Sequence, residues 1–122
     1  MKSKKVVRVK SKPNKRKLDK QILETWSKIV RLVGKCKHCG STHRLQAHHI
    51  ASRTHRATRY AIDNGLCLCS ACHFHEKIDP EAFREMILRV VGEKNYYNMV
   101  NRSRDPTHYK TQDLETIKYN TA

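Results

Sequence analysis

The sequence has few acidic residues and no long apolar segment. Its 122 residues include 11 Asp and Glu against 26 Lys and Arg, a formal net charge of +15. Because so large a positive charge favours a polyanionic partner, nucleic acid is the first candidate. No run of about 18 apolar residues occurs, which excludes a membrane span, and the basic N-terminus lacks the apolar segment of a secretory signal. We therefore expect a cytoplasmic protein of one domain, and with 38% apolar residues its core must be small.

Basic residues are concentrated in two stretches. Residues 1–20 hold ten Lys or Arg and one acid, Asp19, and residues 25–62 hold eight and no acid. Because a run of like charges cannot collapse on itself, we expect residues 1–17 to be a flexible, disordered basic arm. A solubilising tail that contacts nothing is the alternative. The second stretch lies in the folded part and is expected to form a fixed basic surface.

Apolar periodicity predicts helices on both sides of the middle of the chain. The expected helices are residues 19–33, residues 80–91 and a short one that carries Tyr96, Met99 and Val100. Asp19 and Asp79 are the predicted N-caps, and Gly34 and Gly92 follow the two longer helices. Residues 103–122 are expected to be a polar tail or a short helix.

The middle of the chain alternates apolar and polar residues, as strands do. Short strands are predicted at residues 45–48 and 66–69, and Asn64-Gly65 before the second is a turn pair. A helix is expected over residues 70–78. The chain is therefore predicted to be an α+β protein with a small core flanked by helices.

Four of the five cysteines form two Cys-x-x-Cys pairs, and the odd number argues against a disulfide framework. The pairs are Cys36 with Cys39, and Cys69 with Cys72, with 29 residues between them. Two such turns supply the four soft ligands of a tetrahedral structural Zn²⁺. A redox pair or two unrelated pairs are the alternatives. Cys67 is expected to be a small buried side chain.

Three histidines stand close to the predicted strands. His48 and His49 are neighbours on an extended segment, so their side chains point in opposite directions. One can bind a metal ion while the other activates water, and His73 directly follows the last cysteine. Surface or packing histidines are the alternative.

The segments CKHCGSTHRLQAHHI and DNGLCLCSACH together resemble the HNH nuclease family in its four-cysteine zinc-knuckle form. Asn64 follows the second histidine by 15 residues, and the Cys-x-x-Cys-His motif begins five residues later. The resemblance covers residues 36–77. It implies the ββα-metal fold, in which a two-stranded ribbon and a helix hold one divalent ion, with residues 18–102 as the nuclease domain.

The resemblance also implies a role for individual residues. His48 and His73 would bind the catalytic ion, His49 would be the general base, and Asn64 would hold the loop that aims His49 at water. Asn-Gly is also an ordinary turn pair without chemistry. The ion would be Mg²⁺ or Mn²⁺. Many relatives have Asp in place of His48, and because this chain has an imidazole there, Ni²⁺ or Zn²⁺ would also suit the site. The products would carry 5′-phosphate and 3′-hydroxyl ends.

An arginine-rich loop between the predicted strands is a candidate DNA contact. Arg53, Arg56 and Arg59 are three residues apart and would position phosphates without reading sequence. A solvated loop is the alternative. His75 and Lys77, further along the expected helix, are candidates for contacting the scissile phosphate, and exposed helix positions without a partner are the alternative.

A longer pattern, AHHIxSRxxRATRYxxDNG followed by CHxxxxxDPxxFxxxIxxxxGExxY, is similar to the NinG (Rap) recombination endonucleases of lambdoid phages. The similarity implies an enzyme that nicks or resolves branched DNA in the host cytoplasm beside phage recombination proteins, with general duplex DNA as the other substrate. Two symmetric cuts in a four-way junction would favour a homodimer. The alternative function is a zinc-stabilised DNA-binding accessory module of a phage packaging or recombination complex.

Overall fold

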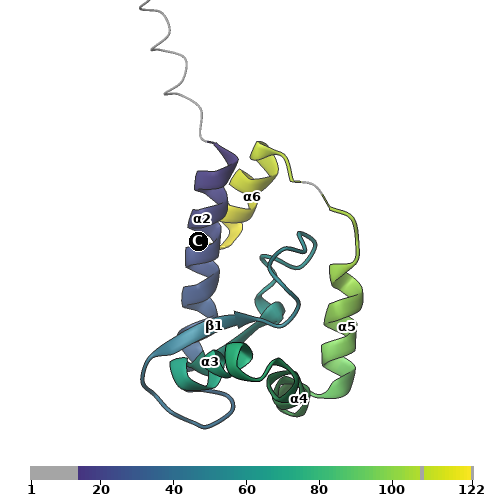
Figure 1. The fold of residues 1–122 in the computed structure, drawn as a ribbon. Coiled ribbons are helices and arrows are strands. Elements are labelled where there is room, and N and C mark those ends of the chain that lie inside the picture. Colours follow the sequence, from purple (N-terminus) through teal and green to yellow (C-terminus); the bar gives the residue numbers. More distant parts are fainter. Residues whose placement is uncertain (1–13, 108, 122) are drawn as a thin grey trace, which may run out of the picture. The chain divides into compact units, whose positions relative to one another are not determined.

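The structure is a computed structural model, and it describes residues 14–107 and 109–121 (Figure 1). Its elements are α2 (Lys15–Val30), η1 (Arg31–Val33), β1 (Leu45–His49), η2 (Ile62–Asn64), β2 (Gly65–Cys69), α3 (Ser70–Ile78), α4 (Pro80–Val91), α5 (Glu93–Ser103) and α6 (Thr111–Thr121). The mixture of helices and a two-stranded antiparallel sheet confirms the predicted α+β class. No helix within the described ranges is long and apolar enough to cross a membrane.

The described residues divide into two compact units. The smaller unit comprises residues 14–25 and 109–121, and the larger comprises residues 26–107. In the smaller unit Leu18, Ile22 and Leu114 are buried, and Lys118 Nζ donates a hydrogen bond of 2.8 Å to Gln21 Oε1. The segment predicted as a polar tail or short helix thus contains α6.

The start of α2 differs from the prediction. The helix begins at Lys15, not after Asp19, and Asn14 is its N-cap, because Asn14 Oδ1 accepts a hydrogen bond of 2.8 Å from the Lys17 amide. Lys and Arg are good helix formers, so the helix continues back to the first residue that can cap it. Residues 15–17 are therefore helical with Asn14 as the cap, and residues 1–13 of the predicted arm lie outside the described residues.

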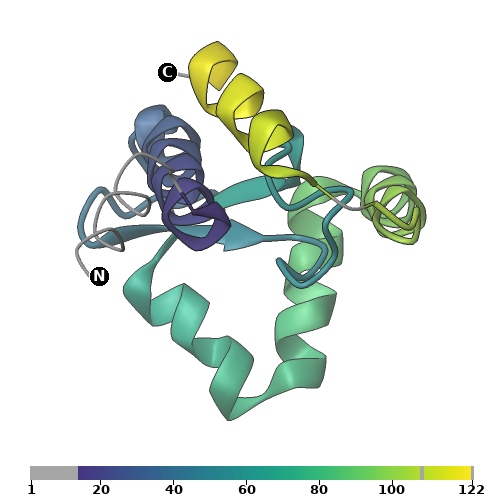
Figure 2. The ribbon, with the colours of Figure 1, turned by 90° about the horizontal axis from the view of Figure 1, so that it is seen from above.

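In the larger unit, β1 pairs with β2 and α3 follows directly, which makes a ββα unit. The register joins Leu45 to Cys69 and His49 to Gly65. The helix α3 contacts both strands and α4, and α4 contacts α5 (Figure 2). Asp79 caps α4 as predicted, since its Oδ1 accepts from the Ala82 amide at 3.2 Å.

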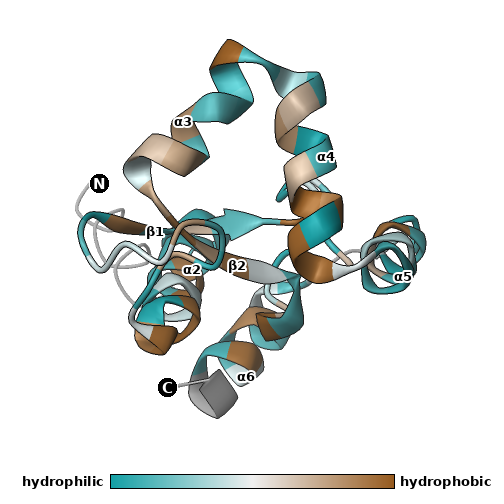
Figure 3. Cartoon of the chain, turned by 90° about the horizontal axis from the view of Figure 1, so that it is seen from below, coloured by the Kyte–Doolittle hydropathy of each residue, from teal (hydrophilic) through white to brown (hydrophobic). Residues whose placement is uncertain are grey.

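Two buried clusters fix this unit. The first cluster joins β2 to α4 and includes Leu66, Leu68, Phe83, Met86 and Ile87. Hydrophobic and hydrophilic residues alternate along α4 (Figure 3). The second cluster consists of Trp26, Val30 and Cys67. The prediction that Cys67 is a buried side chain is confirmed, because only 2% of its surface is exposed.

Candidate functional site

The four cysteines of the two pairs lie together at one end of the ribbon. Their sulfur atoms are all within 4.8 Å of one another, and Cys39 Sγ is 3.6 Å from Cys69 Sγ. Each pair forms a tight turn in which the second amide approaches the first sulfur, at 3.4 Å for Cys39 to Cys36 and 3.5 Å for Cys72 to Cys69. The antiparallel register brings the turns together, because Cys69 ends β2 opposite the start of β1. The cluster is a site that could hold a structural metal ion.

The pKa values of two of these thiols are shifted in opposite directions. Burial raises the pKa of Cys36, but backbone hydrogen bonds, first that of Cys39, outweigh it and bring this pKa down to about 6. Burial and the neighbouring thiols raise the pKa of Cys72. Because a metal ion binds thiolates, loading the cluster must release protons, and metal affinity should increase with pH.

A second group of metal-binding side chains consists of His48, His73 and Glu76, whose candidate ligand atoms all lie within 4.8 Å of one another. His48 Nδ1 is 3.2 Å from His73 Nε2, and His73 Nε2 is 3.9 Å from Glu76 Oε1. Two nitrogens at that separation can both reach one ion at about 2.1 Å. The donor set therefore fits a divalent cation. The spacing His73-x-x-Glu76, one turn apart on a helix, is the sequence signal that would have found Glu76.

The surroundings keep His48 neutral and orient the rings of both histidines of this group. His48 is 7% exposed and packs edge-on against Phe83. Burial, followed by the nearby His73 and His49, lowers the pKa of His48 to about 3. His73 Nδ1 donates to Gln46 Oε1 at 2.7 Å, so its Nε2 lone pair faces His48 and Glu76. Gln46 was not predicted from the sequence.

His49 points away from His48, as strand alternation predicts. Its ring stacks on Trp26 with centroids 3.9 Å apart and planes inclined by 12°. His49 Nε2 donates to the Arg59 carbonyl at 3.0 Å, which leaves Nδ1 as the acceptor. Burial lowers the pKa of His49, the Arg59 carbonyl partly opposes this, and the charges of Arg53 and Arg59 add to the lowering. A neutral imidazole with a free lone pair suits a proton acceptor.

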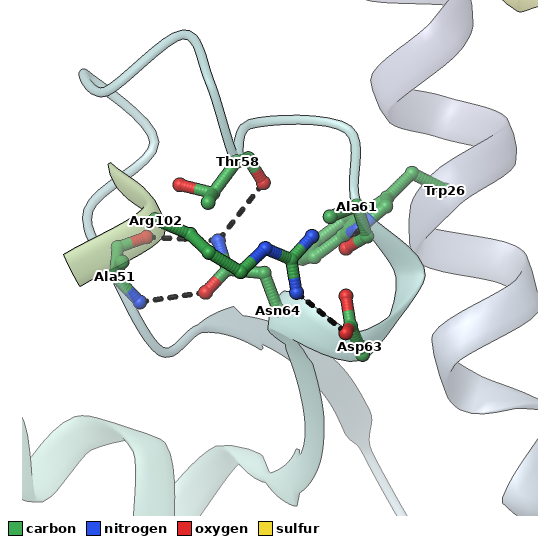
Figure 4. A network of polar contacts seen from close by, with 7 residues as sticks. All are labelled: Trp26, Ala51, Thr58, Ala61, Asp63, Asn64 and Arg102. Atoms are coloured by element: carbon green, nitrogen blue, oxygen red, sulfur yellow. Dashed lines mark hydrogen bonds and ion pairs between the residues drawn. The ribbon is translucent and has the colours of Figure 1, made fainter. Parts of the chain in front are cut away.

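The loop between the strands is held by Asn64, whose surface is 0% exposed (Figure 4). Asn64 Oδ1 accepts from the Ala51 amide at 2.7 Å. Asn64 Nδ2 donates to the carbonyls of Ala51 and Thr58 at 3.0 and 3.1 Å. Trp26 Nε1 donates to the Ala61 carbonyl of the same loop at 2.8 Å. The loop that carries the His49 partner Arg59 is thus fixed from two sides.

An open cleft of about 540 Å³ brings most of these groups together. Its lining includes His48, His49, His73, Glu76 and, from the loop, Arg53. The other predicted DNA contacts lie elsewhere. Arg56 is exposed, and Arg59 is half-buried with its Nε donating to the Arg53 carbonyl at 2.8 Å. Lys77 lines a neighbouring hollow with Gln46, and His75 lines another with His38.

Comparisons with protein-family models, with curated proteins and with solved structures found no match to this chain.

Proposed function

We propose that this protein is a zinc-stabilised, metal-dependent DNA endonuclease of the HNH type. The observation that carries the proposal is the cleft of the ββα unit, which is lined both by the His48, His73 and Glu76 ligand group and by the proton acceptor His49. Four cysteine sulfurs at tetrahedral range suit structural Zn²⁺, and two imidazoles with one carboxylate suit Zn²⁺ or Mn²⁺ better than Mg²⁺. The formal net charge of +15 agrees with a DNA substrate.

The side chains divide the work of phosphodiester hydrolysis. His48, His73 and Glu76 would hold the catalytic ion, which when bound supplies positive charge beside the scissile phosphate. His49 Nδ1 takes a proton from the attacking water, and the Arg59 carbonyl accepts the Nε2 proton and fixes the ring. Arg53 on the rim contacts a phosphate oxygen. Water attacks phosphorus on the side opposite the 3′-oxygen, the bond from phosphorus to that oxygen breaks, and the 3′-oxygen takes a proton from solvent, which leaves 5′-phosphate and 3′-hydroxyl ends.

The proposal extends to branched DNA as the substrate and to phage recombination or packaging as the setting. This part depends on the resemblance of the strand, loop and helix residues to the NinG pattern. Duplex nicking is the other activity that the same cleft chemistry would give.

The test is a cleavage assay on supercoiled plasmid and on a synthetic four-way junction, with protein that carries one equivalent of zinc, enough for the four-cysteine site alone. Mg²⁺, Mn²⁺ or no further ion is added, and wild type is compared with His49→Ala. His43→Ala is the matched control, because His43 is exposed in the turn before β1. We expect cleavage only with added ion, loss of at least about 100-fold in His49→Ala, and no loss in the control.

Equal rates for His49→Ala and wild type would overturn the base assignment. A wild-type protein that binds both DNAs but cuts neither with any ion would overturn the nuclease proposal. It would leave the zinc-stabilised DNA-binding accessory module as the function.

A further inference from the structure

Part of the cleft lining comes from α4 and α5, and Phe83 of α4 packs against the His48 ring. The α4 residues that line the cleft are Pro80, Phe83, Arg84 and Ile87, at helical spacings of three and four. Three of them are apolar, so the charge on this face is that of Arg84. From α5 the cleft receives Tyr96.

Contacts between the two helices hold the Arg84 side chain in place. The Arg84 guanidinium carbon lies 5.8 Å from the centroid of the Tyr96 ring, a cation–π contact. Arg84 Nη2 donates to Tyr97 Oη at 3.3 Å, and the two tyrosine rings meet edge to face with centroids 5.2 Å apart. Arg84 is nevertheless exposed to solvent. An exposed arginine held by one tyrosine ring and a second tyrosine hydroxyl is oriented before any ligand arrives.

A guanidinium beside an aromatic ring matches one nucleotide of a single strand. Arginine binds a phosphate oxygen, and aromatic rings stack with bases that are not paired. In a duplex the bases stack on one another, so a ring in a cleft wall has no base face to contact. Arg53 and the histidines line the same cleft, so a strand that lies in it would meet them as well as Arg84 and Tyr96.

We propose that Arg84 and Tyr96 form a binding site for one unpaired nucleotide next to the scissile phosphate. Arg84 contacts its phosphate, Tyr96 contacts its base, and Tyr97 is a positioning residue that orients Arg84. The proposal rests on the proposed nuclease function and names its substrate class as DNA with unpaired bases beside the cut. It concerns binding, so it is tested without cleavage.

The experiment measures the fluorescence anisotropy of a labelled single-stranded oligonucleotide and of the matching duplex with zinc-loaded protein and no other divalent ion. Arg84→Gln is compared with Arg89→Gln, which removes the same charge from an exposed position of α4 that lines a different hollow. We expect Arg84→Gln and Tyr96→Leu to weaken single-strand binding about tenfold and duplex binding less than about twofold. Arg89→Gln should change neither by more than about twofold.

Equal losses in Arg84→Gln and Arg89→Gln, or an equal loss of Arg84→Gln on both DNAs, would overturn the site. Because Tyr96 is half-buried, a thermal unfolding curve is measured for Tyr96→Leu. If that variant does not fold, the result for Arg84→Gln alone tests the site. Selective loss of single-strand binding in a protein that cuts nothing would uphold this site while the nuclease proposal fails. If the wild type cuts DNA but Arg84→Gln weakens binding to both DNAs equally, the nuclease proposal is upheld and this site is overturned.

Discussion

Asn64→Asp tests how the loop between the strands is held, because it changes one donor group and almost no volume. The carboxylate keeps an oxygen for the Ala51 amide, which Asn64 Oδ1 accepts at 2.7 Å. Its other oxygen replaces the amide nitrogen that donates to the Ala51 and Thr58 carbonyls at 3.0 and 3.1 Å. Two attractive contacts become repulsive ones in a place where the side chain is 0% exposed.

The expected loss of stability follows from the two carbonyls. A buried polar group left without its partner costs about 1–3 kcal/mol, so two give about 2–6 kcal/mol, and repulsion adds to this. We expect Asn64→Asp to lower the free energy of unfolding by at least about 3 kcal/mol at neutral pH. Burial among acceptors raises the pKa of the new carboxyl, so the loss relative to wild type should grow as pH rises above about 3.9.

Urea unfolding of the zinc-loaded proteins measures this loss through the fluorescence of Trp26, the one tryptophan of the chain. Asp63→Asn is the matched control, since Asp63 is exposed and its ion pair with Arg102, at 2.7 Å, should contribute less than about 1 kcal/mol. Trypsin provides a second readout, because a released loop should be cut faster at Arg56. An Asn64→Asp protein within about 1 kcal/mol of wild type, with unchanged loop proteolysis, would refute the reasoning.

Three further predictions concern packing, metal and pH. Gly65→Ala would place a Cβ atom 2.2 Å from Val30 Cγ2, so urea unfolding should show a loss of about 1–3 kcal/mol. Cys69→Ser should lose its bound zinc in a metal assay and unfold, whereas Cys67→Ser, outside the four-sulfur cluster, should keep one equivalent. Because the folded-state pKa of His48 is about 3 against 6.5 when unfolded, the unfolded chain takes up the proton first and stability falls as pH decreases. Between about pH 7.5 and about pH 5.5 this loss is about 1.4 kcal/mol, and it should vanish in His48→Gln.

Helix boundaries were predictable where a capping residue directly precedes the apolar pattern. Asp79 followed by Pro80 has both the side-chain acceptor and the fixed backbone of a helix start, and α4 begins there. At the other end of the chain the apolar pattern predicts a start after Asp19, but α2 begins at Lys15. Apolar periodicity reports which face of a helix is buried, and an exposed first turn leaves no apolar signal.

The cysteine cluster was predictable because each Cys-x-x-Cys turn is local and the strand register brings the two turns together. Glu76 was missed although it lies one helical turn after His73, because an exposed acid at that spacing is common and the sequence does not tell that it lies near the ligand nitrogen. Gln46 was missed for a similar reason. Its hydrogen bond to His73 spans 27 residues and depends on how α3 packs on β1.

His49 shows most clearly what a local motif leaves out. The His-His pair predicts that one ring faces away from the metal ligands, but not what that ring meets. In the structure it meets Trp26, whose periodic position indicated only a buried helix face. Trp26 contacts the His49 ring and also donates to the Ala61 carbonyl, so one side chain from outside residues 36–77 positions both the ring and the loop that binds it. Residues that carry chemistry can be found from spacing, whereas residues that aim them come from packing between distant segments. For this reason, a protein into which only residues 36–77 were grafted would contain the proposed ligands and base but would lack Trp26, which orients the base.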